Sequence, residues 1–262
     1  MSARADIVLL VLVGAGCAHS RPPASVRVKV ALAQELADRG DREAAFEAAE
    51  SACRDAPENG AARAIRGELL AERGLLDEAE ADLRDAVRLA PKLASGHSAL
   101  AVLYERRHQP EAAEDEHRRA VHLAPRDARY LNNLGYALLV HGKAAEAVAV
   151  LQEAARQDPL NRRIRNNLGF AWARTSDYAR AGREFELGGT AAEAKNNLGF
   201  AYELAGNLAA ARAHYRDAAS LDPNLTAARD NLSRLAALPP AGAQTPPDLQ
   251  GAVDPPVPGA PP

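Results

Sequence analysis

Apolar and small residues recur along this chain with a period of 34 residues. Prolines make the period visible, since Pro57, Pro91, Pro125 and Pro159 are 34 residues apart and Pro223 follows after a further 64, which is 34 plus 30. With each proline at position 32 of a unit, the units are 26–59, 60–93, 94–127, 128–161, a shortened 162–191, and 192–225. A period of this length indicates one supersecondary unit stacked in series.

Three positions of the unit carry small residues. Position 8 holds Ala33, Gly67, Ala101, Gly135, Gly169 and Gly199; position 20 holds Ala45, Ala79, Ala113, Ala147, Ala181 and Ala211; position 27 holds Ala52, Ala86, Ala120, Ala154, Gly188 and Ala218. Such residues are needed where two helices approach closely, so each unit is predicted to be a hairpin of two helices of about 14 residues with a turn near position 15. Bulky residues are expected to fill one continuous interior, at position 7 (Leu32, Leu100, Leu134, Leu168, Leu198) and position 11 (Tyr104, Leu138, Trp172, Tyr202).

Local signals mark the turns and the ends of the array. Gly40, Gly74, Gly142 and Gly206 occupy the predicted turn, and His108 replaces glycine in the third unit. The fifth unit ends in Gly188-Gly189, and Thr190 is a plausible N-cap for the next helix. Residues 226–238 supply a seventh first helix as a cap. Residues 239–262 contain nine prolines and no Lys or Arg, so a disordered Pro-rich tail is expected there.

The N-terminus has the pattern of a secretory signal. Arg4 precedes an apolar run from Ile7 to Val13, which is too short to span a bilayer. Gly14-Ala15-Gly16-Cys17 resembles a bacterial lipobox, although that family usually has Leu at the position of Gly14. The resemblance implies a lipoprotein signal peptide at 1–17, lipidation of Cys17, a tether at 18–25 and, with Ala18 after the cysteine, sorting to the outer membrane. The alternative is an ordinary signal peptide cut after Ala18, giving a soluble periplasmic or secreted protein.

The repeated Leu-Gly, Ala and Pro positions between 26 and 225 resemble the tetratricopeptide-repeat (TPR) family. That resemblance implies an all-α solenoid of about six helix-turn-helix repeats with a C-terminal capping helix, at 26–238. It also implies that the first helices line a concave face, with positions 2, 5, 6, 9, 12 and 13 directed towards it.

Asparagine and aromatic residues coincide on that expected face. Position 6 is Asn in four consecutive units, and an aromatic residue stands at position 9 in three of them. The candidate groove comprises Asn132, Asn133, Tyr136, Arg163, Asn166, Asn167, Phe170, Asn196, Asn197, Phe200 and Asn231. Because an amide both donates and accepts hydrogen bonds, this row is predicted to hold a protein or an extended peptide by its backbone. The alternative is that these side chains satisfy neighbouring backbone or pack adjacent repeats.

No pattern of catalytic or cofactor chemistry stands out. His117 and His122 face different sides of a helix, no HExxH or CxxC occurs, and both histidines are expected to be solvated or at the groove rim. A net charge of −3, with 26% charged and 4% aromatic residues, gives no basic field for nucleic acid. We therefore expect no enzyme, metal, cofactor, nucleic acid or small-molecule substrate, and membrane contact only through the lipid.

The signal sequence, repeat number and length together look like the TadD-type lipoproteins of tight-adherence (Flp) pilus assembly and, less closely, the PilF-type pilotins. This resemblance implies a non-enzymatic outer-membrane scaffold, facing the periplasm, that assists assembly of a pilus or secretion machine. The alternative is a periplasmic adaptor or regulator of a cell-envelope enzyme.

Overall fold

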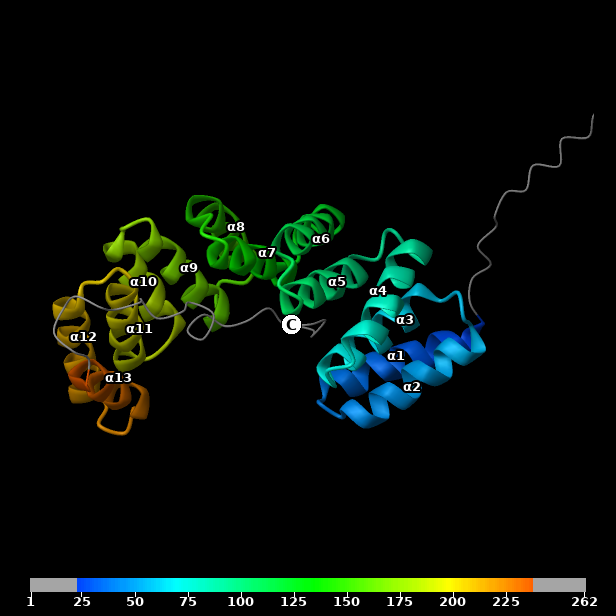
Figure 1. The fold of residues 1–262 in the computed structure, drawn as a ribbon, viewed down its shortest axis with the longest axis horizontal. Helices are drawn as coiled ribbons and strands as arrows, with labels where there is room; N and C mark the ends of the chain where they lie inside the picture. Colours follow the sequence, from blue (N-terminus) through cyan, green and yellow to red (C-terminus); the bar gives the residue numbers. More distant parts are fainter. Residues whose placement is uncertain (1–22, 238–262) are drawn as a thin grey trace, which may run out of the picture.

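The computed structural model describes residues 23–237, which form thirteen α-helices and no strand. The predicted all-α fold is therefore confirmed, and Figure 1 shows successive helical hairpins stacked along the chain. Cys17, the predicted signal peptide 1–17 and the predicted tail 239–262 lie outside the described residues. Among residues 23–237, no helix has the length and apolar character needed to cross a bilayer.

Each repeat contributes two helices, a first and a second. The six hairpins are α1 (Ala24–Asp38) with α2 (Arg42–Asp55), α3 (Gly60–Glu72) with α4 (Leu76–Leu89), α5 (Ala94–Arg106) with α6 (Pro110–Leu123), α7 (Ala128–Val140) with α8 (Ala144–Gln157), α9 (Arg162–Arg174) with α10 (Tyr178–Gly188), and α11 (Ala191–Leu204) with α12 (Leu208–Leu221). A last helix, α13 (Thr226–Ala237), follows without a partner, at the position predicted for the cap. Ala24 and Ser25, predicted to belong to the tether, lie in α1 instead. Pro23 stands at the N-cap of α1, beside helix positions whose N–H groups have no partner within the helix, so it does not oppose an early start.

The turns form where the sequence predicts them. Gly40, Gly74, Gly142 and Gly206 have φ values of 77–83°, a left-handed conformation that glycine adopts without a steric penalty. His108, which replaces glycine in the third repeat, has a φ of 56°. Thr190 caps α11 and forms a capping box with Glu193, as its position after Gly188-Gly189 suggests.

The two helices of a hairpin approach closely at position 8 of the first helix. Because the residue there is Gly or Ala, the side chain at position 24 of the second helix packs directly against it. A Cβ added to Gly135 would lie 2.4 Å from Leu151 Cγ, and one added to Gly169 would lie 2.5 Å from the ring of Phe185. Gly67 meets Leu83 and Gly199 meets Tyr215 in the same way, at 2.8 Å. Where position 8 is alanine, position 24 is Ala49 or His117. The predicted close approach is confirmed, and its partner is a side chain of the second helix.

The stacking of hairpins distinguishes an inner from an outer layer. Consecutive first helices contact each other in the pairs α1–α3, α3–α5, α7–α9 and α9–α11, whereas consecutive second helices make no comparable contact within residues 23–237. First helices therefore lie on the shorter, inner side of the solenoid. We call the surface that they form the inner wall.

The apolar interior is not continuous, contrary to the prediction. One cluster runs from Leu131 to Leu204 across α7–α11, and another from Leu70 to Ala113 across α3–α6. Between their buried residues, the third repeat buries polar side chains: His97, Ser98, Glu116 and His117. These groups are hydrogen-bonded or ion-paired rather than packed as hydrocarbon, so they interrupt the apolar core.

The two ends of the solenoid are finished differently. At the C-terminal end, the buried carboxylate of Glu203 accepts hydrogen bonds from Tyr215 at 2.8 Å and from Arg234 of α13 at 2.8 Å. At the N-terminal end, Leu32 is 49% exposed, so the prediction that it lies in the interior is wrong. The equivalent Leu100, Leu134 and Leu168 are buried, and each follows another hairpin, whereas α1 is the first helix of residues 23–237.

Candidate functional site

The asparagines of the candidate groove connect successive first helices. The position-6 amide of one repeat donates a hydrogen bond to the position-5 side chain of the repeat before it. The donor-acceptor distances are 3.3 Å from Asn133 Nδ2 to Ser98 Oγ, 3.0 Å from Asn167 to Asn132 Oδ1, 3.3 Å from Asn197 to Asn166 Oδ1, and 3.0 Å from Asn231 to Asn196 Oδ1. We call these four contacts the amide ladder. Its geometry matches the alternative in which these residues join adjacent repeats.

Burial divides the candidate groove into two parts. Asn132, Asn133 and Asn167 are between 0% and 3% exposed, and Tyr136 and Phe170 are also buried. The expectation of an open groove is therefore wrong at these five positions, three amides and two aromatic residues. The amides are covered because they pair with neighbouring first helices, Asn133 with Ser98 and Asn167 with Asn132. The two aromatic residues belong to the apolar cluster of α7–α11.

The remaining candidates are partly accessible on the inner wall. Arg163, Asn166, Asn196, Asn197, Phe200 and Asn231 are half-buried. The Phe200 ring meets that of Phe170 edge-on with centroids 6.1 Å apart, so one aromatic residue is fixed in the core while its neighbour reaches the surface. This accessible part, between α9 and α13, keeps the chemistry expected of a peptide contact, namely amide groups beside an aromatic face.

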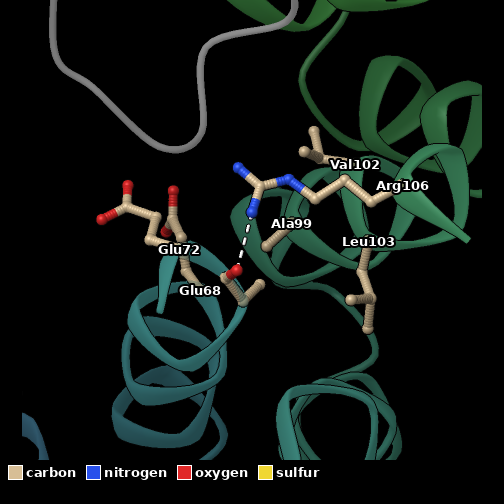
Figure 2. Close-up of a pocket in the computed structure, with 7 residues that line it drawn as sticks. Glu68, Glu72, Ala99, Val102, Leu103 and Arg106 are labelled. Carbon is tan, nitrogen blue, oxygen red and sulfur yellow. Dashed lines mark hydrogen bonds between the residues drawn. The ribbon is translucent and has the colours of Figure 1, made fainter. Parts of the chain in front are cut away.

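A pocket opens in the other half of the inner wall, between α3 and α5 (Figure 2). It is a shallow pocket, open to solvent on one side, and it is lined by Glu68, Ala71, Glu72, Ala99, Val102, Leu103 and Arg106. Arg106 donates a hydrogen bond of 2.7 Å to the carbonyl oxygen of Ala71, which links the two helices across the pocket. The asparagine pattern of the later repeats gives no indication of this pocket. Charged residues at positions 9 and 13 of the second repeat are the signal that the sequence offers for it.

Two carboxylates in this pocket differ in their pairing. Glu72 forms an ion pair with Arg42 of α2 at 3.1 Å. Glu68 makes no hydrogen bond or ion pair with any residue of 23–237. Burial raises the pKa of the Glu68 carboxyl to about 7, and the negative charge of Glu72 adds to the rise.

The histidines have structural roles. His117 is fully buried, so the prediction that it is solvated or at the groove rim is wrong; its Nε2 lies 3.2 Å from Glu105 Oε1. The cause is that it occupies position 24, where other repeats place the residue that packs on position 8. His122 is exposed. Within residues 23–237, no three His, Cys, Asp or Glu side chains are grouped so as to hold a metal ion.

Comparison with family models identifies the repeat. One model, described as "Tetratricopeptide repeat", matches residues 30–94, 98–161 and 140–190, and a second model with the same description matches 192–225. Together these segments span more than half of the chain. No curated protein matches this sequence.

Solved structures share the fold at low sequence identity. The TPR protein YrrB, whose structure is described as having an unusual peptide-binding site, is 20% identical over 71% of this chain and 97% of its own, with a TM-score of 0.57. Pseudomonas aeruginosa pilF is 18% identical over 80% of this chain and 97% of its own, with a TM-score of 0.62. MamA from Desulfovibrio magneticus RS-1 is 21% identical over 63% of this chain and 94% of its own, with a TM-score of 0.52. At these identities the likeness concerns the fold.

Proposed function

Because the chain belongs to the tetratricopeptide-repeat family, we propose that it is a non-enzymatic scaffold that holds another polypeptide along its inner wall. The observation that carries this proposal is the inner wall itself. Its first helices present half-buried amides and Phe200 at one end and a pocket at the other. An extended segment laid along this surface would contact several repeats at once.

The sequence supports a finer proposal, that the scaffold is an outer-membrane lipoprotein assisting assembly of a pilus or secretion machine. The Gly14-to-Cys17 pattern supplies the anchor, and α1 begins seven residues after Cys17, which would hold the solenoid near the membrane. The likeness in fold to Pseudomonas aeruginosa pilF is compatible with this role.

The anchor and the partner can be tested together. The chain should incorporate labelled palmitate and fractionate with membranes, and Cys17→Ser should abolish both. This soluble form, used as bait on detergent extracts of the envelope, should retain a secretin or pilus subunit. Recovery of a cell-wall hydrolase instead would favour the adaptor role, and unchanged pilus and secretin levels after gene deletion would remove the assembly role.

The binding surface needs a separate test. Asn197→Ala combined with Phe200→Ala should weaken retention of the partner, because both side chains are accessible on the inner wall. Leu187→Ala, an exposed residue of α10, is the matched control and should leave retention unchanged. Equal retention by all three proteins would show that the partner binds elsewhere.

A further inference from the structure

We propose that the pocket between α3 and α5 receives a basic side chain, lysine or arginine, of the polypeptide held on the inner wall. This inference rests on the proposed scaffold function and adds a requirement on the sequence of the partner.

The surface at the mouth of the pocket suits contact with a long aliphatic side chain that has a charged end. Ala71, Ala99, Val102 and Leu103 supply hydrocarbon against which the methylene groups of lysine or arginine can pack. Glu68 and Glu72, one helical turn apart on α3, both line the pocket, and Figure 2 shows them on its α3 side, across from Arg106 of α5. A cation entering along the apolar wall would therefore end beside two carboxylates.

The charges already present leave one carboxylate for an outside partner. Arg42 pairs with Glu72, and Arg106 is engaged with the Ala71 carbonyl without forming an ion pair with either glutamate. The other sheltered acidic residues of the described chain are paired: Asp82 with Arg63 and Arg66, Glu116 with His97 and Arg119, and Glu203 with Arg234. Glu68 differs from them in two ways: it is half-buried, and it forms no ion pair, so its carboxylate can pair with a cation that reaches it from solvent.

The groups around Glu68 come from five helices and set the pH dependence of such binding. They are Asp38 on α1, Arg42 on α2, Glu72 on α3, Arg106 on α5 and Tyr130 on α7. Burial and the two neighbouring acids favour the protonated carboxyl at low pH, and protonated Glu68 attracts a cation less strongly. Binding of a basic side chain should therefore be tighter at pH 8 than at pH 6.

Peptide selection tests the proposal while the natural partner is still unidentified. The probe is a random nine-residue peptide display library, selected on the full chain carrying Cys17→Ser. We expect lysine or arginine to be enriched at one position of the selected peptides. Glu68→Gln, which keeps the shape of the side chain, should abolish that enrichment. Glu78→Gln, an exposed residue of α4, is the matched control and should preserve it.

A selected peptide then gives a quantitative measurement by calorimetry. Replacing its enriched lysine by norleucine should weaken binding about tenfold, the size expected for one hydrogen bond between charged groups, and should have little effect on Glu68→Gln. Peptides selected without a basic preference, or a norleucine effect that persists in Glu68→Gln, would overturn the inference and leave the scaffold function standing. Selection of no peptide at all would overturn both.

Discussion

At the scale of single residues, the size of one side chain sets how closely each hairpin closes. Position 8 is glycine where position 24 is Leu, Phe or Tyr, as in Gly135 with Leu151. Interiors are close-packed, so even one methyl group added at such a contact must displace its neighbours. The position-8 glycines are therefore required by their partners on the second helix, in contrast to the turn glycines, which are required by their φ values.

This contact predicts the effect of a single methyl group. Gly135→Ala should lower stability by about 1–3 kcal/mol, because its Cβ would lie 2.4 Å from Leu151 Cγ. Gly96→Ala, in another first helix, is the control: its Cβ would be 3.5 Å from the nearest atom, so no loss is expected. Thermal unfolding midpoints followed by circular dichroism would compare the two. A gain in stability at both positions would mean that helix propensity, which favours alanine over glycine, outweighs the contact.

At the scale of elements, first helices are joined by polar contacts that depend on burial for their strength. The amide ladder repeats one geometry in four places, from the fully covered pair Asn132–Asn167 to the half-buried pair Asn196–Asn231. A buried donor without its acceptor loses the full desolvation free energy, whereas an accessible donor can bind water instead. The same contact should therefore matter more in the middle of the solenoid than near its end.

A pair of double-mutant cycles measures this difference. Asn132→Ala should lower the free energy of unfolding by about 1–3 kcal/mol, because it leaves the buried Asn167 amide N–H without an acceptor. The double variant Asn132→Ala/Asn167→Ala should lose less stability than the sum of the losses of the two single variants. The matched cycle at Asn196 and Asn231 should be nearly additive. Urea unfolding supplies the free energies, and equal coupling in the two cycles would contradict this account.

The hairpin α5–α6 has a pH-dependent contact. His97 Nδ1 lies 2.6 Å from Glu116 Oε2, and this hydrogen bond raises the pKa of His97 despite its burial. A raised folded-state pKa means that the contribution to stability is complete below about pH 6.5 and is lost as the pH rises through the folded-state pKa. The urea midpoint of the wild type should therefore exceed that of His97→Gln by more at pH 6 than at pH 8.5. The comparison removes the opposite contribution of His214, whose pKa is lowered by burial. A difference that grows towards pH 8.5 would be the wrong sign for this mechanism.

At the scale of the whole molecule, buried polar groups in the third repeat separate two apolar clusters. The cluster across α7–α11 holds the large side chains Leu151, Phe170 and Phe185, while the clusters across α1–α3 are built largely from alanine and other small residues. Repeat arrays are stabilised by nearest-neighbour contacts, so we expect the halves on either side of this polar region to open separately.

Hydrogen exchange in moderate urea should resolve these halves. Peptides from α1–α4 should lose protection at a lower urea concentration than peptides from α7–α11, because less apolar area holds them. Gly135→Ala should lower the protection of α7–α11 and leave α1–α4 nearly unchanged. Loss of protection in all helices at one urea concentration would instead indicate a single cooperative unit.

The sequence predicts the fold well because its signals act within one unit. The roles of several residues are set by contacts within one hairpin or at its edge, so a periodic pattern reveals them. These residues are the alanines of positions 20 and 27, the turn glycines and Thr190. The inner wall depends on how one hairpin rotates against the next, which the pattern of a unit does not contain. For this reason the pattern places Asn133 and Asn167 on the surface, and it does not reveal the pocket formed by Glu68 and Arg106, which come from different repeats.

The pairing of positions 8 and 24 also constrains how such a gene can change. A recombination event that exchanges a complete hairpin carries both positions together and preserves the fit. A crossover inside the hairpin separates them, and it would join Ala101 to a partner as large as Tyr215, or Gly199 to one as small as Ala49. The first product would clash and the second would contain a void. Duplication and exchange in whole repeats is therefore the route that this architecture tolerates.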